Sequence, residues 1–306
     1  MKKRLLRGLA ALAALCLLLA GCAKRQEAED GTKYLAASFY PLYVLSLNVT
    51  RDVPELSLSC LTQPQDGCLR SYQLSDWDYS VLRGQDALIL GGQGLESFEN
   101  LVSSMTEGPI VITCLAGLPL LSGEEGAYGE ESHLAGNNPF IYLSIPGAMR
   151  VASTIAYSLA EIDPDYAVLY QRNLTRYLER LEKLADEAND IMAAAPAKPV
   201  ALMTEGAAYF ADQFALPVAV RIDHEPGVDP SDNELTDILE QLEQSGARTV
   251  ILEEQAPGHL VDALREAGYS VALFDLMTTH MADGNAAAYE EIMLENCRRV
   301  ARALAG

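Results

Sequence analysis

The chain has 306 residues and a formal net charge of −21. So acidic a protein is a poor partner for nucleic acid, because binding to phosphate requires a basic face. Hydrophobic residues make up 49% of the sequence, enough for a packed core, and the length exceeds one typical domain, which suggests two.

The N-terminal segment predicts export. A basic head is followed by an apolar run at 9–20, shorter than the roughly 20 residues that a bilayer core requires, so we interpret residues 1–21 as a signal peptide. The run ends in Leu-Ala-Gly-Cys, which resembles the bacterial lipobox and implies a lipid anchor at Cys22. Residues 22–32 are polar and aperiodic, which is typical of a tether. We therefore expect an exported protein anchored to the outer face of the bacterial cytoplasmic membrane, or on its periplasmic side.

The mature chain is predicted to be more acidic than the precursor. Removal of residues 1–21 takes away four basic residues and no acidic ones, which changes the net charge from −21 to −25. Such a body is not expected to lie flat on anionic lipid, so the acyl chain would carry the attachment. Beyond residue 21 the sequence contains no apolar segment long enough to cross a membrane.

Four further cysteines follow Cys22. Cys114 and Cys297 have apolar neighbours and are predicted to be buried thiols. Cys60 and Cys68 flank a short loop outside the reducing cytosol, which permits a disulfide between them, although free thiols are the preferred interpretation. No Cys-x-x-Cys pair or Cys/His cluster with metal-ligand spacing occurs in the sequence.

Short apolar runs rich in β-branched residues predict eight strands, and amphipathic helical patterns separate most of them. This alternation favours an α/β fold with mostly parallel sheets flanked by helices. Helices are expected at 76–84 and 232–245, each after a serine with an acidic residue three positions on, and at 257–267. The predicted strands are 34–40, 55–61, 86–91, 109–115, 198–204, 217–222, 248–253 and 269–275.

The middle of the chain carries no strand signal. After Asp163-Pro164, a pair typical of a helix start, tyrosines and leucines recur at helical spacing through 164–193, opposite a charged face. A helix of that length is roughly 45 Å long, enough to run along two domains. We predict an N-terminal lobe at 33–145, a helical connector at 146–195 with a rigid backbone helix at 164–193, and a C-terminal lobe at 196–306.

The ends of the predicted strands suggest where a ligand would bind. Open α/β sheets bind ligands beyond the carboxyl ends of their strands, so two lobes that face each other would bring those ends to one cleft. The groups at the strand ends are Phe39-Tyr40, the loop 62–71, Thr204-Glu205, Glu253-Glu254 and Asp275. This pattern does not by itself name a ligand.

Several segments together resemble the zinc- and manganese-binding solute receptors of ABC transporters. Residues 38–43 (SFYPLY) are similar to the family's opening after its first strand, and 138–143 (NPFIYL) to its Asp-Pro-His-Val-Trp-Leu segment. The resemblance implies two lobes on a backbone helix, a ligand cleft between them and an ABC permease in the membrane as partner. It covers nearly the whole mature chain, and the other matching segments are 72–75, 91–96, 159–164, 230–231, 250–254 and 274–275.

The family's metal ligands are three histidines and one carboxylate drawn from both lobes. The resemblance places these positions at Arg70, Phe140, Thr204 and Asp275, of which only Asp275 retains the family's ligand type. Zn²⁺ is bound by imidazole nitrogen, thiolate or carboxylate, whereas arginine brings a permanent positive charge. The resemblance therefore implies a degenerate metal site, in which we expect Arg70 to pair with Asp275 or Glu205.

Other contents of the cleft stay open on the sequence. Arg70 could bind the carboxylate of a small organic anion with Tyr40, Phe140 and Tyr142 as an aromatic wall, or these aromatic residues could belong to the core. Glu205 and Glu254 add carboxylate oxygens, which suit Mn²⁺. No cofactor is assigned, and zinc or manganese remains an open alternative.

The four histidines form no evident replacement set. His133 lies in an acidic loop at 122–137, which we interpret as a solvated loop, with a metal-capture loop as the alternative. His224 and His280 could reach the cleft, but surface positions are the preferred interpretation for both. The fourth is His259.

The sequence lacks the common catalytic signatures, including the Gly-x-Ser-x-Gly elbow, the phosphate loop and the His-Glu-x-x-His helix, so we predict a binding protein and no enzyme. The expected function is that of an extracytoplasmic solute-binding lipoprotein of a metal-type ABC importer, acting as a monomer. The alternatives are a receptor for a small organic anion and a surface lipoprotein that keeps the fold for adhesion or assembly.

Overall fold

A computed structural model describes residues 31–64, 72–105, 108–122, 137–224 and 227–306. These residues form two four-stranded parallel sheets, with strand orders β2-β1-β3-β4 and β6-β5-β7-β8. The predicted α/β class and all eight predicted strands are confirmed. The strands are β1 (Lys33–Ala37), β2 (Leu56–Cys60), β3 (Ala87–Leu90), β4 (Ile110–Thr113), β5 (Val200–Leu202), β6 (Val218–Arg221), β7 (Thr249–Glu253) and β8 (Ser270–Phe274).

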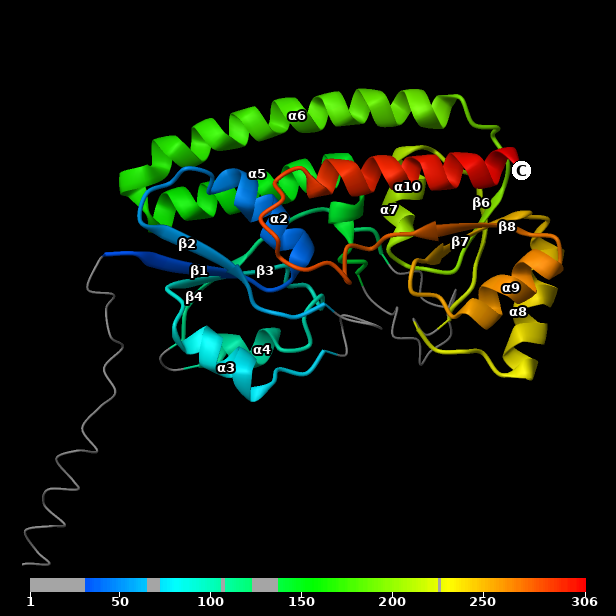
Figure 1. Ribbon diagram of the computed structural model, residues 1–306, viewed down its shortest axis with the longest axis horizontal. Coiled ribbons are helices and arrows are strands. Elements are labelled where there is room, and N and C mark those ends of the chain that lie inside the picture. The colour runs from blue at the N-terminus through cyan, green and yellow to red at the C-terminus, as the bar shows by residue number, and fades with distance from the viewer. Residues whose placement is uncertain (1–30, 65–71, 106–107, 123–136, 225–226) are drawn as a thin grey trace, which may run out of the picture.

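The helices fall into a long layer and two short pairs (Figure 1). The layer that runs along both sheets contains α5 (Ile145–Ile162), α6 (Ala167–Ala193) and α10 (Ala288–Ala305), with α2 (Tyr40–Val49) and α7 (Ala207–Gln213) beneath it. On the other side, α3 (Asp76–Arg83) and α4 (Glu99–Ser103) cover the first sheet, and α8 (Asp232–Ser245) and α9 (Gly258–Glu266) cover the second.

One apolar core joins the two lobes. It extends from Ile89 of the first sheet through Leu174 and Leu181 of α6 to Ile251 of the second sheet, all of them buried. Two smaller clusters fill the outer faces of the sheets, beneath α3/α4 and beneath α8/α9. Because the helical layer packs on both sheets at once, neither lobe has its inner face covered without it.

Capping residues fix the helix ends that the sequence predicts. Ser75 and Ser231 each accept a hydrogen bond from the third residue of their helix, and that residue's carboxylate accepts one from the serine backbone. Both capping boxes are therefore confirmed. Gly246 ends α8 with φ of +72°, a left-handed conformation that glycine adopts without steric cost.

Asp163 does not cap the backbone helix, contrary to the expectation. Residues Pro164–Tyr166 form a 3₁₀ turn and α6 begins only at Ala167. The buried Asp163 carboxylate instead pairs with Lys33 and accepts a hydrogen bond of 2.7 Å from the Tyr170 hydroxyl. This contact ties the first residue of β1 to the corner between α5 and α6.

The structure describes only part of the regions predicted to hold a disulfide and a membrane anchor. The Cys60 thiol is free among the described residues and lies 3.5 Å from the Thr62 carbonyl oxygen. Cys68 lies outside the described residues, so the disulfide alternative stays untested. The signal segment, Cys22 and the tether up to residue 30 also lie outside them. Among the described helices, none combines the length and hydrophobicity that a membrane crossing needs.

Candidate functional site

The carboxylate of Asp275, directly after β8, lies where the two lobes meet. Its Oδ2 lies 2.7 Å from Nε2 of His280, and its Oδ1 accepts a 2.7 Å hydrogen bond from the Met277 backbone. Burial alone would raise the pKa of Asp275, but the hydrogen bond and charge of His280 outweigh it and hold the pKa below its usual range. The hydrogen bond to Asp275 in turn raises the pKa of His280, against the effect of its partial burial.

A strained turn brings His280 back to Asp275. Met277 is buried and has φ of +63°, a left-handed conformation that costs a residue with a side chain about 1 kcal/mol or more. The Asp275 backbone is fixed by Asn296 of α10, which accepts a hydrogen bond from its N–H and donates one to its carbonyl, each 2.9 Å long. Gln255 holds the middle of the turn by donating to the Thr278 hydroxyl.

The N-terminal lobe contributes Tyr40 to this junction. Its ring stacks on the imidazole of His280, with 5.1 Å between centroids and 24° between planes. Burial, together with the negative charges of Asp283 and Asp275, raises the pKa of Tyr40 to about 12. The predicted cleft residues Tyr40 and Asp275 are thus brought together, and His280 lies between them.

A second buried carboxylate, Glu96, lies beyond the ends of β1 and β3. It accepts hydrogen bonds from the Ser38 hydroxyl and from the backbone N–H groups of Gly91 and Gly92, at 2.7, 2.7 and 2.8 Å. Complete burial raises its pKa to about 7 despite these donors. Glu96 therefore joins the two segments, 38–43 and 91–96, that carry much of the family resemblance.

The position expected for the second histidine, Phe140, belongs to the core. Phe140 is buried with its ring 6.2 Å from that of Tyr142, which is also fully buried. Tyr289 of α10 donates to the Tyr142 carbonyl at 2.8 Å. Of the two interpretations of these aromatic residues, core packing fits their burial.

Thr204 and Glu205, at the end of β5, face the N-terminal lobe through their backbone. The Glu205 carbonyl accepts a 2.9 Å hydrogen bond from the Asn138 side chain. Thr204 is buried. Next to them, Gly206 has no room for a side chain, because a Cβ there would lie 2.4 Å from Leu276 and 2.9 Å from Leu143. The lobes therefore meet here by direct contact.

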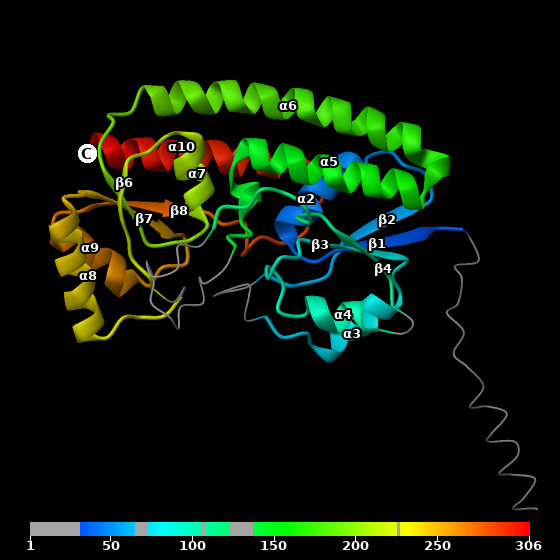
Figure 2. The same cartoon turned by 180° about the vertical axis from the view of Figure 1, so that it is seen from behind.

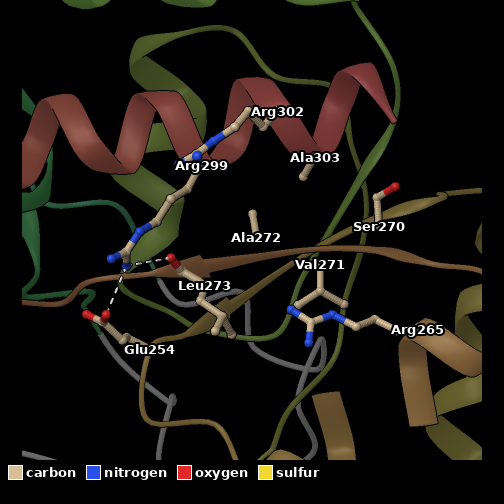
Figure 3. A pocket seen from close by; sticks show the side chains of 9 residues that line it. All are labelled: Glu254, Arg265, Ser270, Val271, Ala272, Leu273, Arg299, Arg302 and Ala303. Atoms are coloured by element: carbon tan, nitrogen blue, oxygen red, sulfur yellow. Dashed lines mark hydrogen bonds and ion pairs between the residues drawn. The ribbon is translucent and has the colours of Figure 1, made fainter. Parts of the chain in front are cut away.

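Glu254 lies beside the strand end that carries Asp275, and its place in the cleft stays a prediction. Its backbone N–H donates to the Phe274 carbonyl at 2.9 Å, and its negative charge contributes to the raised pKa of His280. Glu254 is exposed, and its carboxylate lies 3.1 Å from Nη1 of Arg299 on α10 (Figure 3). There it borders a pocket of about 470 Å³ beside β8, which is not the junction of the lobes. Its neighbour Glu253 is buried, and burial raises the pKa of Glu253. The two glutamates thus point to opposite sides of the strand end.

The remaining predicted residues are spread out or undescribed. His224 is half-buried beside a cavity of about 360 Å³ in the C-terminal lobe, and His259 is exposed, 4.0 Å from Asp229. Arg70 and His133 lie outside the described residues, so the pairing of Arg70 with Asp275 or Glu205 stays a prediction. Both oxygens of Asp275 already have donors without it.

The described residues do not fit a zinc site. No group of three or more His, Cys, Asp or Glu side chains with the placement to hold a metal ion occurs among them. At three inherited ligand positions, only Asp275 offers a ligand, against the four that structural zinc usually takes. Their assignment as the family's ligand positions stays a prediction.

His280 is less exposed than its sequence context indicates. A surface position is the preferred interpretation from the sequence, whereas about two thirds of the side chain is covered in the structure. The one available signal was its separation of five residues from Asp275, which permits a return contact only if the chain turns sharply between them. Met277 gives no sign of such a turn, because methionine rarely adopts a left-handed φ.

Two parallel sheets on a shared helical layer, with strand ends meeting at one junction, define the class of two-lobed solute-binding proteins. The structure is similar to that of the SBP FpvC of Pseudomonas aeruginosa in complex with a nickel ion, with a TM-score of 0.75 and 26% sequence identity. The match covers 89% of this chain and 97% of that one.

The model of the family described as ZnuA, zinc-uptake complex component A, periplasmic, matches residues 35–303, and the chain belongs to this family. It is 26% identical over 269 residues to the zinc-binding lipoprotein AdcA of Streptococcus pneumoniae, which covers 84% of this chain and 52% of AdcA. The chain thus spans about half the length of the AdcA relatives it matches. It is 22% identical to the high-affinity zinc uptake system protein ZnuA of Bacillus subtilis, over 84% of this chain and 83% of that protein.

Proposed function

We propose that this protein is the extracytoplasmic solute-binding lipoprotein of an ABC importer of the zinc and manganese type, with a degenerate metal site. The observation that carries the proposal is the family match at 35–303, which includes both sheets and the helical layer between them. In this role the protein captures a solute at the junction of its lobes and delivers it to a membrane permease.

The sequence of the N-terminus supports the proposed location. The predicted signal peptide at 1–21 and the lipobox cysteine Cys22 would place the folded body outside the cytoplasmic membrane on a tether of about ten residues. We assign the lobes to 33–145 and 196–306, joined by the connector at 146–195.

The junction supports a weakened metal site. Asp275 is engaged by His280 and by the Met277 backbone, and the described inherited positions offer no nitrogen ligand. A cation that reaches this junction would compete with the His280 imidazole and the Met277 N–H for the Asp275 oxygens, and the remaining coordination would come mostly from water. We expect the affinity for Zn²⁺ and Mn²⁺ to be far below that of a four-ligand site.

Elemental analysis of the mature chain, purified without added metal, tests the site. We expect much less than one equivalent of zinc, manganese or nickel. One tightly bound equivalent that is lost in Asp275→Ala, and kept in Glu161→Ala at an exposed position of α5, would contradict the degenerate site.

Copurification from detergent-solubilised membranes tests the receptor role. The lipidated full chain is expected to bring down an ABC permease and its ATPase, identified by mass spectrometry, after mild crosslinking. The Cys22→Ala variant, which cannot be lipidated, serves as the control and should bring down much less. Absence of any permease with the lipidated chain would favour the alternative of adhesion or assembly.

A further inference from the structure

One segment of the C-terminal lobe lies on the N-terminal lobe. Residues 276–287, here called the strap, leave the end of β8, cross the junction beside α2 and return as α10 (Figures 1 and 2). The whole strap lies within the described part of the chain.

Three contacts attach the strap along its length. At its start, the Tyr142 hydroxyl donates to the Leu276 carbonyl at 3.4 Å. In its middle, the ring of His280 stacks on Tyr40, the first residue of α2. Near its end, the Asn48 side chain, in the last turn of α2, donates to the Ala286 carbonyl at 2.9 Å.

The backbone helix α6 locks the far end of the strap. Arg180 donates from Nη1 to Asn48 at 2.6 Å and from Nη2 to the Ala286 carbonyl at 2.9 Å, and it also forms an ion pair with Glu290 of α10. One guanidinium therefore joins the N-terminal lobe, the strap and the start of α10. Its planar donor geometry suits several acceptors at once.

We propose that the strap holds the two lobes together without cargo, and that the His280 side chain takes the place between them that a bound cation would fill. Asp275 is the one inherited ligand, and its contact to the opposite lobe runs through the imidazole of His280 to Tyr40. The contacts that close the junction thus come from the chain itself. The inference rests on the proposed function for the meaning of the junction, but its contacts can be tested independently.

Hydrogen exchange of the mature chain, read by mass spectrometry, tests the strap. In His280→Ala we expect exchange to rise by about threefold or more both in the strap and across the junction in α2, because a local opening would release both. The matched control is His259→Ala, which removes an exposed histidine of α9 and should change neither segment. Addition of Zn²⁺ or Mn²⁺ to the wild type should leave both segments unchanged.

Two results would overturn the proposal. One is unchanged exchange in α2 in His280→Ala, which would show that the histidine does not connect the lobes. The other is a marked slowing of exchange in α2 of the wild type by either cation, which would show that closure depends on cargo. If His280→Ala does not fold, His280→Phe replaces it in the test. The phenylalanine ring can still stack on Tyr40, but the hydrogen bond to Asp275 is lost. The expected increase in exchange is then smaller in α2 than in the strap.

The same variants separate this proposal from the receptor role. If the wild type copurifies with no permease, the receptor role fails, whereas the exchange result still decides the strap. If the permease is captured but His280→Ala leaves α2 unchanged, the strap fails and the receptor role stands.

Discussion

Each lobe buries one carboxylate near the junction, and the two are held in different ways. Among the described residues, Glu96 of the N-terminal lobe accepts hydrogen bonds from neutral donors alone, namely Ser38 and two glycine N–H groups, and its pKa is raised to about 7. Asp275 of the C-terminal lobe has an imidazole partner and a pKa below its usual range.

The difference shows what keeps a buried carboxylate charged. Three hydrogen bonds to Glu96 do not compensate for its complete loss of water. For Asp275, which is less fully buried, the His280 imidazole does so together with the Met277 N–H and the charge of Arg299. Glu96 therefore has a structural role, since it connects the segments 38–43 and 91–96, whereas Asp275 stays ionised. Variants of these two carboxylates and of their partners test the difference.

The largest effect is expected from Glu96→Ala. It leaves a cavity and three buried donors without an acceptor, at about 1 kcal/mol or more each, so we expect a loss of about 4 kcal/mol in the free energy of unfolding. Urea denaturation measures it, with the exposed Glu161→Ala of α5 as control. A loss below about 1 kcal/mol would show that Glu96 does not hold the two segments together.

The next effect is the pH dependence that Glu96 confers. Because its pKa is raised from 4.5 to about 7 in the folded protein, folding retains a proton that the unfolded chain releases, and stability falls as the pH rises from about 4.5 to 7. The fall should approach about 3 kcal/mol and level off above pH 7. In Glu96→Gln the same titration should lack this slope; an identical slope in both proteins would contradict the raised pKa.

The Asp275–His280 pair should behave in the opposite sense on the acid side. The lowered pKa of Asp275 contributes stability that is present above about pH 3.8 and is lost as the pH falls through the folded pKa. The raised pKa of His280 contributes stability that is present below about pH 6.5 and is lost as the pH rises through the folded pKa.

A double-mutant cycle of Asp275→Asn and His280→Gln tests the pH range over which the two charged side chains stabilise the fold. We expect a coupling energy of about 1 kcal/mol at pH 5, a modest value because a third of the His280 side chain is exposed and water screens the pair. The coupling should shrink at pH 9. A coupling that grows with pH would mean that the histidine is not the cationic partner.

The smallest effect is expected from Ser38→Ala. The variant removes one of three donors to Glu96 and leaves the two backbone donors in place, so we expect a loss of about 1 kcal/mol or less. It should also raise the midpoint of the Glu96-dependent pH titration. A larger loss than that of Glu96→Ala would reverse the roles assigned to the two residues.

The fold was largely predictable because its signals are local. The strands carry continuous apolar runs, and Ser75 and Ser231 begin α3 and α8 as their capping boxes predict. Asp163 was less predictable, because its buried partners, Lys33 and Tyr170, compete for the carboxylate that would otherwise cap a helix.

The site was less predictable because its contacts depend on turns and on distant partners. The contact of His280 with Asp275 requires the left-handed φ of Met277, and a methionine does not indicate such a φ in a sequence. Glu254 is predicted at the cleft from its place at a strand end, and the structure adds a partner, Arg299, that lies 45 residues further along the chain. The partners of His280 and Glu254 are determined by tertiary contacts, which leave no local pattern in the sequence.

The place of β1 in its sheet has a mechanical consequence. The strand begins at Lys33 and lies between two parallel neighbours, β2 and β3. A pull on the N-terminal end of the folded body would act along the strand and load both ladders in shear, so their hydrogen bonds would have to break together. The pairing of Lys33 with Asp163 would pass part of the force to the corner between α5 and α6, and the lobe should resist traction from that end.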